Sequence, residues 1–138
     1  MSPSYNHSVL QANLIGVLKN LKKYSIACEL SLEINGIEYR PDICIYPKRP
    51  LSIPRDIIKM TEMPLLSIEI ISITQTIDDI LNKFEAYFGA GIKSCWLVIP
   101  FPFAVMVFSS IDKVKTYSDH EIIDENLNIR IQSQELFD

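Results

Sequence analysis

The spacing of hydrophobic residues changes from helical to extended within the first third of the chain. Leucine and valine recur on one helical stripe over residues 5–23, and Ser4 stands before this stripe as an N-cap. Residues 26–34 and 37–46 are rich in β-branched side chains and flank an Asn-Gly pair at positions 35–36, which is typical of a tight hairpin. The pattern predicts a helix followed by a two-stranded hairpin.

The rest of the chain predicts strands around one amphipathic helix. Four prolines within 47–64 predict a loop with at most a short helical turn. Apolar residues of both parities over 65–72 predict a strand that is covered on both faces. Thr76 and Asp79 form a capping-box pattern at the start of a helix that Gly89 and Gly91 end. Residues 93–99, 103–109 and 113–117 predict three more strands, the last at an edge, and no element is assigned from residue 119 onward.

This order of elements predicts an α/β fold, a mixed sheet flanked by helices, in a single domain over residues 1–138. Apolar residues make up 48% of the chain and charged residues 22%, a balance typical of a folded globular protein. The net charge of −4 argues against a broadly basic nucleic-acid-binding surface. A local basic cleft, or a metal ion that supplies positive charge, is still compatible with it.

The three cysteines, Cys28, Cys44 and Cys95, are odd in number and include no C-x-x-C pair. We expect reduced core thiols in a cytoplasmic protein. The N-terminus lacks a signal-peptide pattern, and the longest apolar run is broken by prolines, so we expect no contact with a membrane. The apolar segment 100–103 is either core or a homodimer contact.

Two acidic residues lie in segments whose hydrophobic pattern predicts burial. Alternation along the strand 37–46 places Asp42 on one face with Glu38 and Arg40, and Glu69 lies within the apolar strand 65–72. If these strands are neighbours, Asp42 and Glu69 converge, and a divalent cation would relieve the repulsion between them. In the alternative, Glu69 pairs with Arg40 or Lys83 and Asp42 caps a turn. The spacing alone leaves both interpretations open.

Four stretches, "MSPSYNH", "RPDICIY", "PLLSIEIIS" and "DILNKFEAYFGAGIKSCWLV", carry a resemblance over residues 1–109. They resemble the PD-(D/E)XK nuclease superfamily and, more closely, the bacterial family of putative restriction endonucleases, long described as a domain of unknown function. The resemblance implies a restriction-endonuclease-like core. In that family a Pro-Asp pair is followed, at fixed spacing, by residues that match Glu69, Ser72, Asp79, Lys83, Tyr87, Gly91 and Trp96.

The resemblance implies that Asp42, Glu69 and the carbonyl of Ile70 bind Mg²⁺ or Mn²⁺. Ile71 occupies the position where the nuclease motif places its lysine, and the family pattern supplies Lys83 from the next helix instead. The implied chemistry is metal-assisted hydrolysis of a phosphodiester, with Asp42, Glu69 and Lys83 as the catalytic residues.

Other residues are weaker candidates. Asp79, Lys83 and Tyr87 follow one another four residues apart on one helix face, where an exposed Asp79–Lys83 ion pair is the alternative to a site. Glu29 and Glu33 are further possible ligands, although both fit solvated strand positions. His7 matches a family position at the start of the first helix, where a structural role is equally compatible.

The expected function is therefore that of an Mg²⁺-dependent nuclease of the PD-(D/E)XK type, with nucleic acid as substrate. The family usually has an acid-bearing strand before "MSP", and Ile73, Gln75 and Ile99 replace its usual residues. The alternative is a catalytically silent, N-terminally shortened member that acts as a binding or assembly module. A third interpretation is a hydrolase of small molecules or nucleotides with the same metal site.

Overall fold

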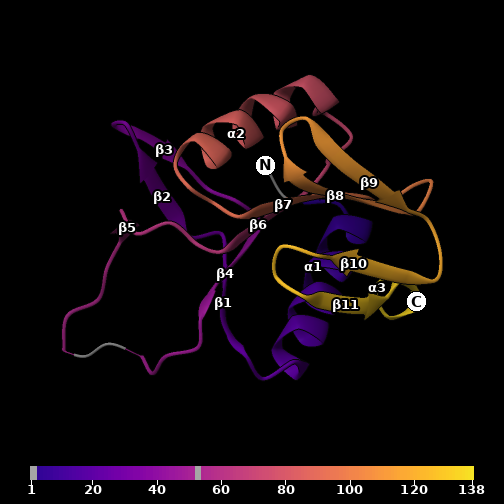
Figure 1. Cartoon of the computed structure of the whole chain (residues 1–138), viewed down its shortest axis with the longest axis horizontal. Coiled ribbons are helices and arrows are strands. Elements are labelled where there is room, and N and C mark those ends of the chain that lie inside the picture. Colours follow the sequence, from indigo (N-terminus) through magenta and orange to yellow (C-terminus); the bar gives the residue numbers. More distant parts are fainter. Residues whose placement is uncertain (1–2, 52–53) are drawn as a thin grey trace.

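A six-stranded mixed sheet forms the centre of the protein in this computed structural model, which describes residues 3–51 and 54–138 (Figure 1). The strand order is β1-β4-β6-β7-β8-β9. The parallel pair β6–β7 lies among antiparallel pairs, which confirms the predicted mixed sheet. The strands are β1 (Tyr24–Cys28), β4 (Ile43–Pro47), β6 (Leu66–Ile70), β7 (Ser94–Ile99), β8 (Ala104–Ser110) and β9 (Lys113–Tyr117).

Helices cover the two faces of this sheet. The helix α2 (Ile77–Gly89) lies on one face, and α1 (Tyr5–Asn20) lies on the other with the hairpin β10 (Glu121–Asp124)–β11 (Ile129–Gln132) and the short helix α3 (Ser133–Phe137) (Figure 1). Each layer has its own apolar core. All five residues of β6 are buried between the two layers, as its apolar pattern predicts.

The ends of both long helices follow from local chemistry. The side chain of Ser4 accepts a hydrogen bond from the backbone N–H of His7 at 3.2 Å, and Thr76 and Asp79 form the predicted capping box. Gly91 has a φ of +101°, a conformation that glycine adopts readily just after a helix. The helix α1 ends at Asn20, three residues before the predicted end.

The predicted hairpin is divided into four shorter strands. The turn at Asn35 and Gly36 is present, with φ of +51° and +78°, and it joins β2 (Ser31–Ile34) to β3 (Ile37–Tyr39). Glu29 has a φ of +54° between β1 and β2, and Pro41 lies between β3 and β4. Because of these breaks, β2 and β3 join β5 (Lys59–Met60) in a separate three-stranded sheet.

This division overturns the predicted face of Glu38, Arg40 and Asp42. Only Glu38 lies in a strand, and Arg40 and Asp42 belong to the connection from β3 to β4. Arg40 pairs with Glu38 at 3.8 Å, so the proposed Arg40–Glu69 pair is wrong. A proline cannot supply the backbone donor that a continuous strand needs at position 41, which explains the interruption.

The segments on either side of β6 differ from the expectations in detail. The loop 47–64 contains the two-residue strand β5 instead of a helical turn, and residues 52–53 lie outside the described part.

The C-terminal segment, to which the sequence assigns no element, is held to the sheet by Asp124. Its buried carboxylate accepts hydrogen bonds from Trp96 Nε1 at 2.8 Å and from Ser94 Oγ at 3.1 Å. This network fixes the β10–β11 hairpin against β7.

Two expectations about burial need correction. Cys44 and Cys95 are buried free thiols, but Cys28 is exposed at the end of the edge strand β1. Burial raises the pKa of Cys44 to about 12, which does not favour a reactive thiolate. Phe101 and Phe103 are exposed and do not belong to the core, so the homodimer contact of segment 100–103 stays a prediction. No helix among the described residues combines the length and apolarity that crossing a membrane requires.

Candidate functional site

Pairing between β4 and β6 brings the two predicted carboxylates together. The strands run antiparallel, with Ile43 opposite Ile68 as the last pair of the ladder. Asp42 directly precedes Ile43 and Glu69 directly follows Ile68, so the two acids continue this register by one step. The break at Pro41 releases Asp42 from the strand and leaves its carboxylate free to bond to β6.

Asp42 is half-buried and is held by groups from two elements. Its Oδ2 accepts hydrogen bonds from the backbone N–H of Ile70 at 2.7 Å and from His7 Nε2 at 3.2 Å. Since an ionised carboxylate only accepts hydrogen bonds, His7 Nε2 is the protonated ring nitrogen in this arrangement. Gln11 donates from its amide to the backbone carbonyl of Asp42 at 3.1 Å. Burial raises the pKa of Asp42, and the donated bonds from Ile70 and His7 partly oppose this effect.

Glu69 is almost fully buried, with 2% of its surface exposed. Tyr87 on α2 donates its hydroxyl proton to Glu69 Oε2 at 3.0 Å, and Lys83 Nζ lies 3.7 Å from Oε1. Burial, followed by the nearby charge of Asp42, raises the pKa of Glu69 to about 8, although Lys83 and Tyr87 favour the ionised form. The free protein therefore retains a proton at this pair near neutral pH, and a bound cation would replace it.

A cleft of about 310 Å³ opens beside Asp42. Side chains from α1 and from the segment before α2 form its walls, and Glu29 contributes from the turn after β1. Its lining residues are Pro3, His7, Gln11, Glu29, Asp42, Ser72, Thr74 and Gln75. Asp42 is thus the member of the carboxylate pair that lines the cleft, whereas Glu69 is buried and does not line it.

Most of the residues that the sequence points to meet here. Lys83 and Tyr87 contact Glu69, while Asp79 caps its own helix through Thr76 and forms no ion pair with Lys83 among the described residues. The predicted Asp79–Lys83 alternative is therefore wrong. Glu33 lies outside the cleft, opposite Glu38 in the separate small sheet.

Gln11 is a contact of the site that the sequence reading does not include. It follows His7 by four residues, so both side chains lie on one face of α1 and reach Asp42 together. This spacing was the available signal, but it becomes informative only when α1 is known to lie beside Asp42.

The donor set fits a hard, oxygen-binding cation. Mg²⁺ is commonly held by one or two carboxylates, with water and substrate phosphate completing its shell. Asp42 and Glu69 are two carboxylates of this kind, and burial, followed by the charge of Asp42, raises the pKa of Glu69. The N–H and C=O of an extended residue face the same neighbouring strand, so the Ile70 carbonyl lies on the Asp42 side of β6. No group of three or more His, Cys, Asp or Glu residues suited to a metal occurs among residues 3–51 and 54–138, which does not favour a zinc-type centre.

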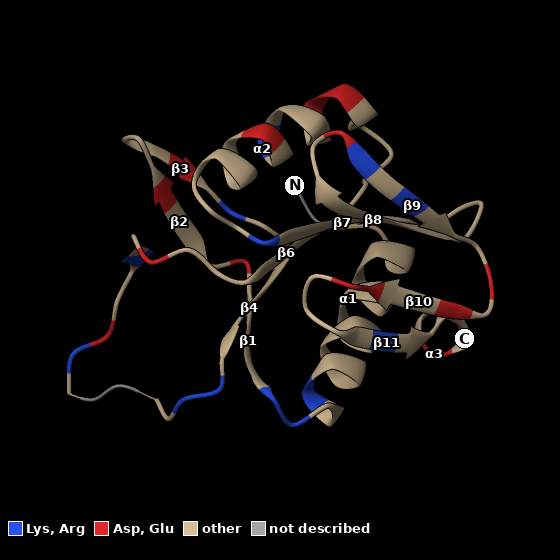
Figure 2. Cartoon of the chain, in the orientation of Figure 1, with Lys and Arg blue, Asp and Glu red and all other residues tan. Residues whose placement is uncertain are grey.

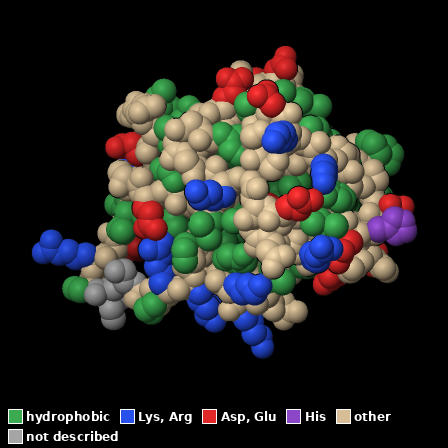
Figure 3. Space-filling view, viewed as in Figure 1, with side chains coloured by type: hydrophobic (Ala, Val, Ile, Leu, Met, Phe, Trp, Pro, Cys, Tyr) green, Lys and Arg blue, Asp and Glu red, His purple; other side chains and the backbone are tan. Residues whose placement is uncertain are grey.

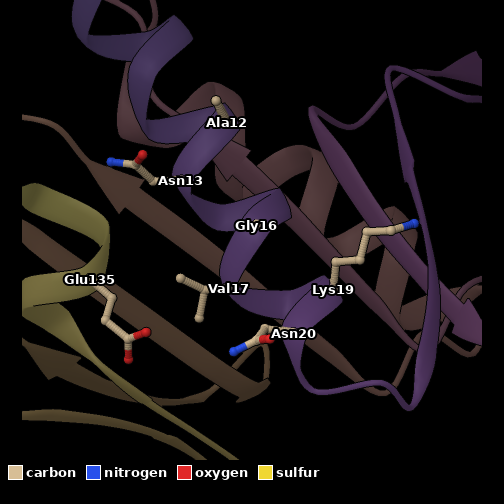
Figure 4. A pocket seen from close by; sticks show the side chains of 7 residues that line it. All are labelled: Ala12, Asn13, Gly16, Val17, Lys19, Asn20 and Glu135. Carbon is tan, nitrogen blue, oxygen red and sulfur yellow. The ribbon is translucent and has the colours of Figure 1, made fainter.

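A larger pocket, of about 640 Å³, lies elsewhere along α1 (Figure 4). Its lining includes the small residues Ala12 and Gly16, and Lys19 and Glu135 are its only charged members. Its lining residues include no pair of acids and no nucleophile, so the cleft beside Asp42 is the better candidate site.

Replacing Tyr87 by phenylalanine tests how tightly Glu69 is positioned. The change removes one hydroxyl in a buried site and leaves Glu69 Oε2 without its donor. We expect the free energy of unfolding to fall by about 1–3 kcal/mol, measured by urea denaturation at pH 7. Tyr39→Phe is the matched control, because Tyr39 packs edge-on against Tyr87 with ring centroids 5.6 Å apart and is only partly buried. Equal stability of the two variants would contradict a positioning role for the Tyr87 hydroxyl.

Comparison with known proteins assigns this chain to a family. Residues 1–137 match the model of the Uma2 family, whose description is "Putative restriction endonuclease". No curated protein matches the chain. A crystal structure of a putative nuclease belonging to DUF820 from Anabaena variabilis ATCC 29413 superposes with a TM-score of 0.79 at 18% identity, covering 99% of this chain and 83% of that one. This similarity confirms the expected restriction-endonuclease-like fold, and the chain belongs to the Uma2 family.

Proposed function

We propose that the protein is a metal-dependent nuclease that hydrolyses phosphodiester bonds of nucleic acid with Mg²⁺ or Mn²⁺. The observation that carries this proposal is the juxtaposition of a buried and a half-buried carboxylate, Glu69 and Asp42, beside an open cleft. An acid pair that resists joint ionisation is a costly feature for a purely structural site, and a divalent cation would remove the cost.

Each residue has a distinct part in this proposal. Asp42 and Glu69, with the carbonyl of Ile70, hold the cation, which when bound polarises the phosphoryl oxygen and lowers the pKa of water. Lys83 lies 3.7 Å from Glu69 Oε1 and is one-third exposed, so its ammonium group reaches the acid pair and still contacts solvent. It stabilises the negative charge that grows on the phosphate as the bond breaks. His7 and Tyr87 orient Asp42 and Glu69 through the hydrogen bonds described above.

The experiment is a cleavage assay with labelled single- and double-stranded DNA and RNA in Mg²⁺, in Mn²⁺ and in EDTA. We expect cleavage with metal only, and a decrease of about 100-fold or more in kcat for Lys83→Ala. Lys93→Ala is the matched control, because this exposed lysine directly precedes β7 and, unlike Lys83, forms no ion pair with Glu69 among the described residues. No cleavage of any substrate by the wild type, or equal loss in both variants, would contradict the proposal.

A catalytically silent member that acts as a binding or assembly module is the second candidate. The observation in its favour is that Asp42 Oδ2 already accepts two hydrogen bonds, from Ile70 and His7, within the chain itself. Such a carboxylate could serve only to join α1 to β6. This candidate predicts that Asp42→Asn changes stability and binding without any loss of cleavage, because none is present in the wild type.

A further inference from the structure

Four exposed lysines gather where α1 runs into β1 and where β4 ends. Lys19, Lys22 and Lys23 come from the end of α1 and the following turn, and Lys48 follows β4. The backbone N–H of Lys48 donates to the carbonyl of Lys23 at 3.3 Å, which holds the two segments together. Figure 2 shows basic segments at this end of the molecule. We name these four residues the lysine cluster.

No acid neutralises the lysine cluster. Within the part of the chain that the structure describes, none of its members forms an ion pair. Neighbouring Arg49 differs, since it pairs with Glu62 at 3.0 Å and stacks on Tyr46. In Figure 4, the Lys19 side chain extends from α1 away from α3, the helix that carries Glu135. The cluster is thus a set of free cations.

The cluster also makes the molecule electrically polar. The whole chain has 13 basic and 17 acidic residues, so these four lysines offset a strongly acidic remainder. Figure 3 shows several basic side chains along the lower edge of the surface and a group of acidic ones at the top, with both signs present between them. A positive end on a negative protein attracts a polyanion in one orientation and repels it elsewhere.

The edge of the sheet connects the lysine cluster to the candidate site. The antiparallel pair β1–β4 aligns Tyr24 with Pro47 at the cluster end and Cys28 with Ile43 at the cleft end. From Lys48 to Asp42 the chain runs back over six residues, which is about 20 Å in an extended strand. Successive phosphates of one nucleic-acid strand are about 3.4 Å apart along the helix axis, so about six nucleotides span this distance.

We propose that the lysine cluster binds the sugar-phosphate backbone of a nucleic acid about six nucleotides away from the phosphate that the Asp42–Glu69 site receives. This inference rests on the proposed nuclease function. It explains how a protein with net charge −4 holds a polyanion near two carboxylates, because the attraction acts at a distance from them. A nucleic acid is favoured over an anionic membrane because the cluster and the cleft lie along a single edge, which suits a linear polymer.

The test compares the cluster variant Lys22→Gln/Lys23→Gln/Lys48→Gln with a control triple, Lys93→Gln/Lys113→Gln/Lys115→Gln. Of the exposed control lysines, Lys93 directly precedes β7, and Lys113 and Lys115 lie in β9, where Lys115 pairs with Glu125 at 3.0 Å. Binding of a fluorescein-labelled 20-nucleotide DNA strand and of a 20-base-pair duplex is measured by anisotropy in EDTA over a range of salt concentrations. We expect the slope of log K against log salt to become shallower by about 2–3 in the cluster variant, because three phosphate contacts are lost. The control variant should keep the wild-type slope.

The outcomes separate this inference from the proposed function. Equal slopes in both variants, or no binding by the wild type, would overturn the role of the lysine cluster. The inference would also be overturned, in favour of a membrane, if the wild type bound phosphatidylserine vesicles, the cluster variant did not, and both bound DNA equally. Cluster-dependent binding in EDTA without cleavage in Mg²⁺ would support the cluster and contradict the nuclease. Thermal unfolding by circular dichroism verifies that both triple variants are folded.

Discussion

The double variant Asp42→Ala/Glu69→Ala is expected to lose saturable Mg²⁺ and Mn²⁺ binding and to lose cleavage by about 1,000-fold or more. Both predicted carboxylate ligands disappear, and a bound metal supplies several kcal/mol of the stabilisation of the transition state in this class of reaction. Isothermal titration calorimetry with each metal gives the binding result, and the cleavage assay gives the rate.

Two controls make this result interpretable. Glu33→Ala removes an exposed acid that lies outside the cleft. It should retain both metal binding and cleavage. The single variants Asp42→Asn and Glu69→Gln keep the size of each side chain and show whether one carboxylate suffices. Equal, negligible heats for the wild type and the double variant would refute a metal site in the free protein, and titration with DNA present would then decide whether substrate phosphate completes it.

In EDTA, the stability of the wild-type protein is expected to fall as the pH rises from 5 to 8. The pKa of Glu69 is raised from its ordinary value of 4.5 to about 8 by burial and by Asp42. The folded state therefore holds a proton that the unfolded state releases, so the stabilisation is complete below pH 4.5 and is lost progressively up to pH 8. The loss approaches about 1.4 kcal/mol per pH unit within this window. The raised pKa of Asp42 acts in the same direction.

Urea denaturation at several pH values measures this slope. Glu69→Gln cannot ionise, so its stability should change less with pH than that of the wild type. The advantage in stability of the wild type over the variant should therefore be larger at pH 5 than at pH 8. Glu85→Gln, on the exposed side of α2, should retain the wild-type slope. Addition of Mg²⁺ at pH 8 should restore stability to the wild type and leave Glu69→Gln nearly unchanged, because the cation stabilises the ionised pair. A parallel course of wild type and Glu69→Gln would contradict the buried, coupled state of Glu69.

The elements of the fold could be predicted where local chemistry decides them. The Ser4 cap, the capping box at Thr76 and the turn at Asn35 and Gly36 depend on neighbouring residues and are present as predicted. The apolar run of β6 likewise predicts its central position, since only a strand covered on both faces tolerates apolar side chains of both parities.

Strand partners and buried contacts could not be predicted in this way. The sequence indicates that Asp42 and Glu69 would converge if their strands were neighbours, but the condition is met by the β4–β6 register, a contact between segments far apart in the chain. The pairing of β2 with β5 in a separate sheet, which leaves Arg40 and Asp42 in the connection from β3 to β4, likewise depends on a contact between distant segments.

The sequence by itself determined the family pattern, the acidic balance and the identity of the acids, lysine and tyrosine near the cleft. Only the tertiary structure decided which side chains meet: Tyr87 and Lys83 contact Glu69, and His7 and Gln11 contact Asp42. It also decided that Lys48 lies beside Lys23. The physical reason is that burial and charge interactions depend on distance in space, and hydrophobic periodicity reports only how each segment faces the core.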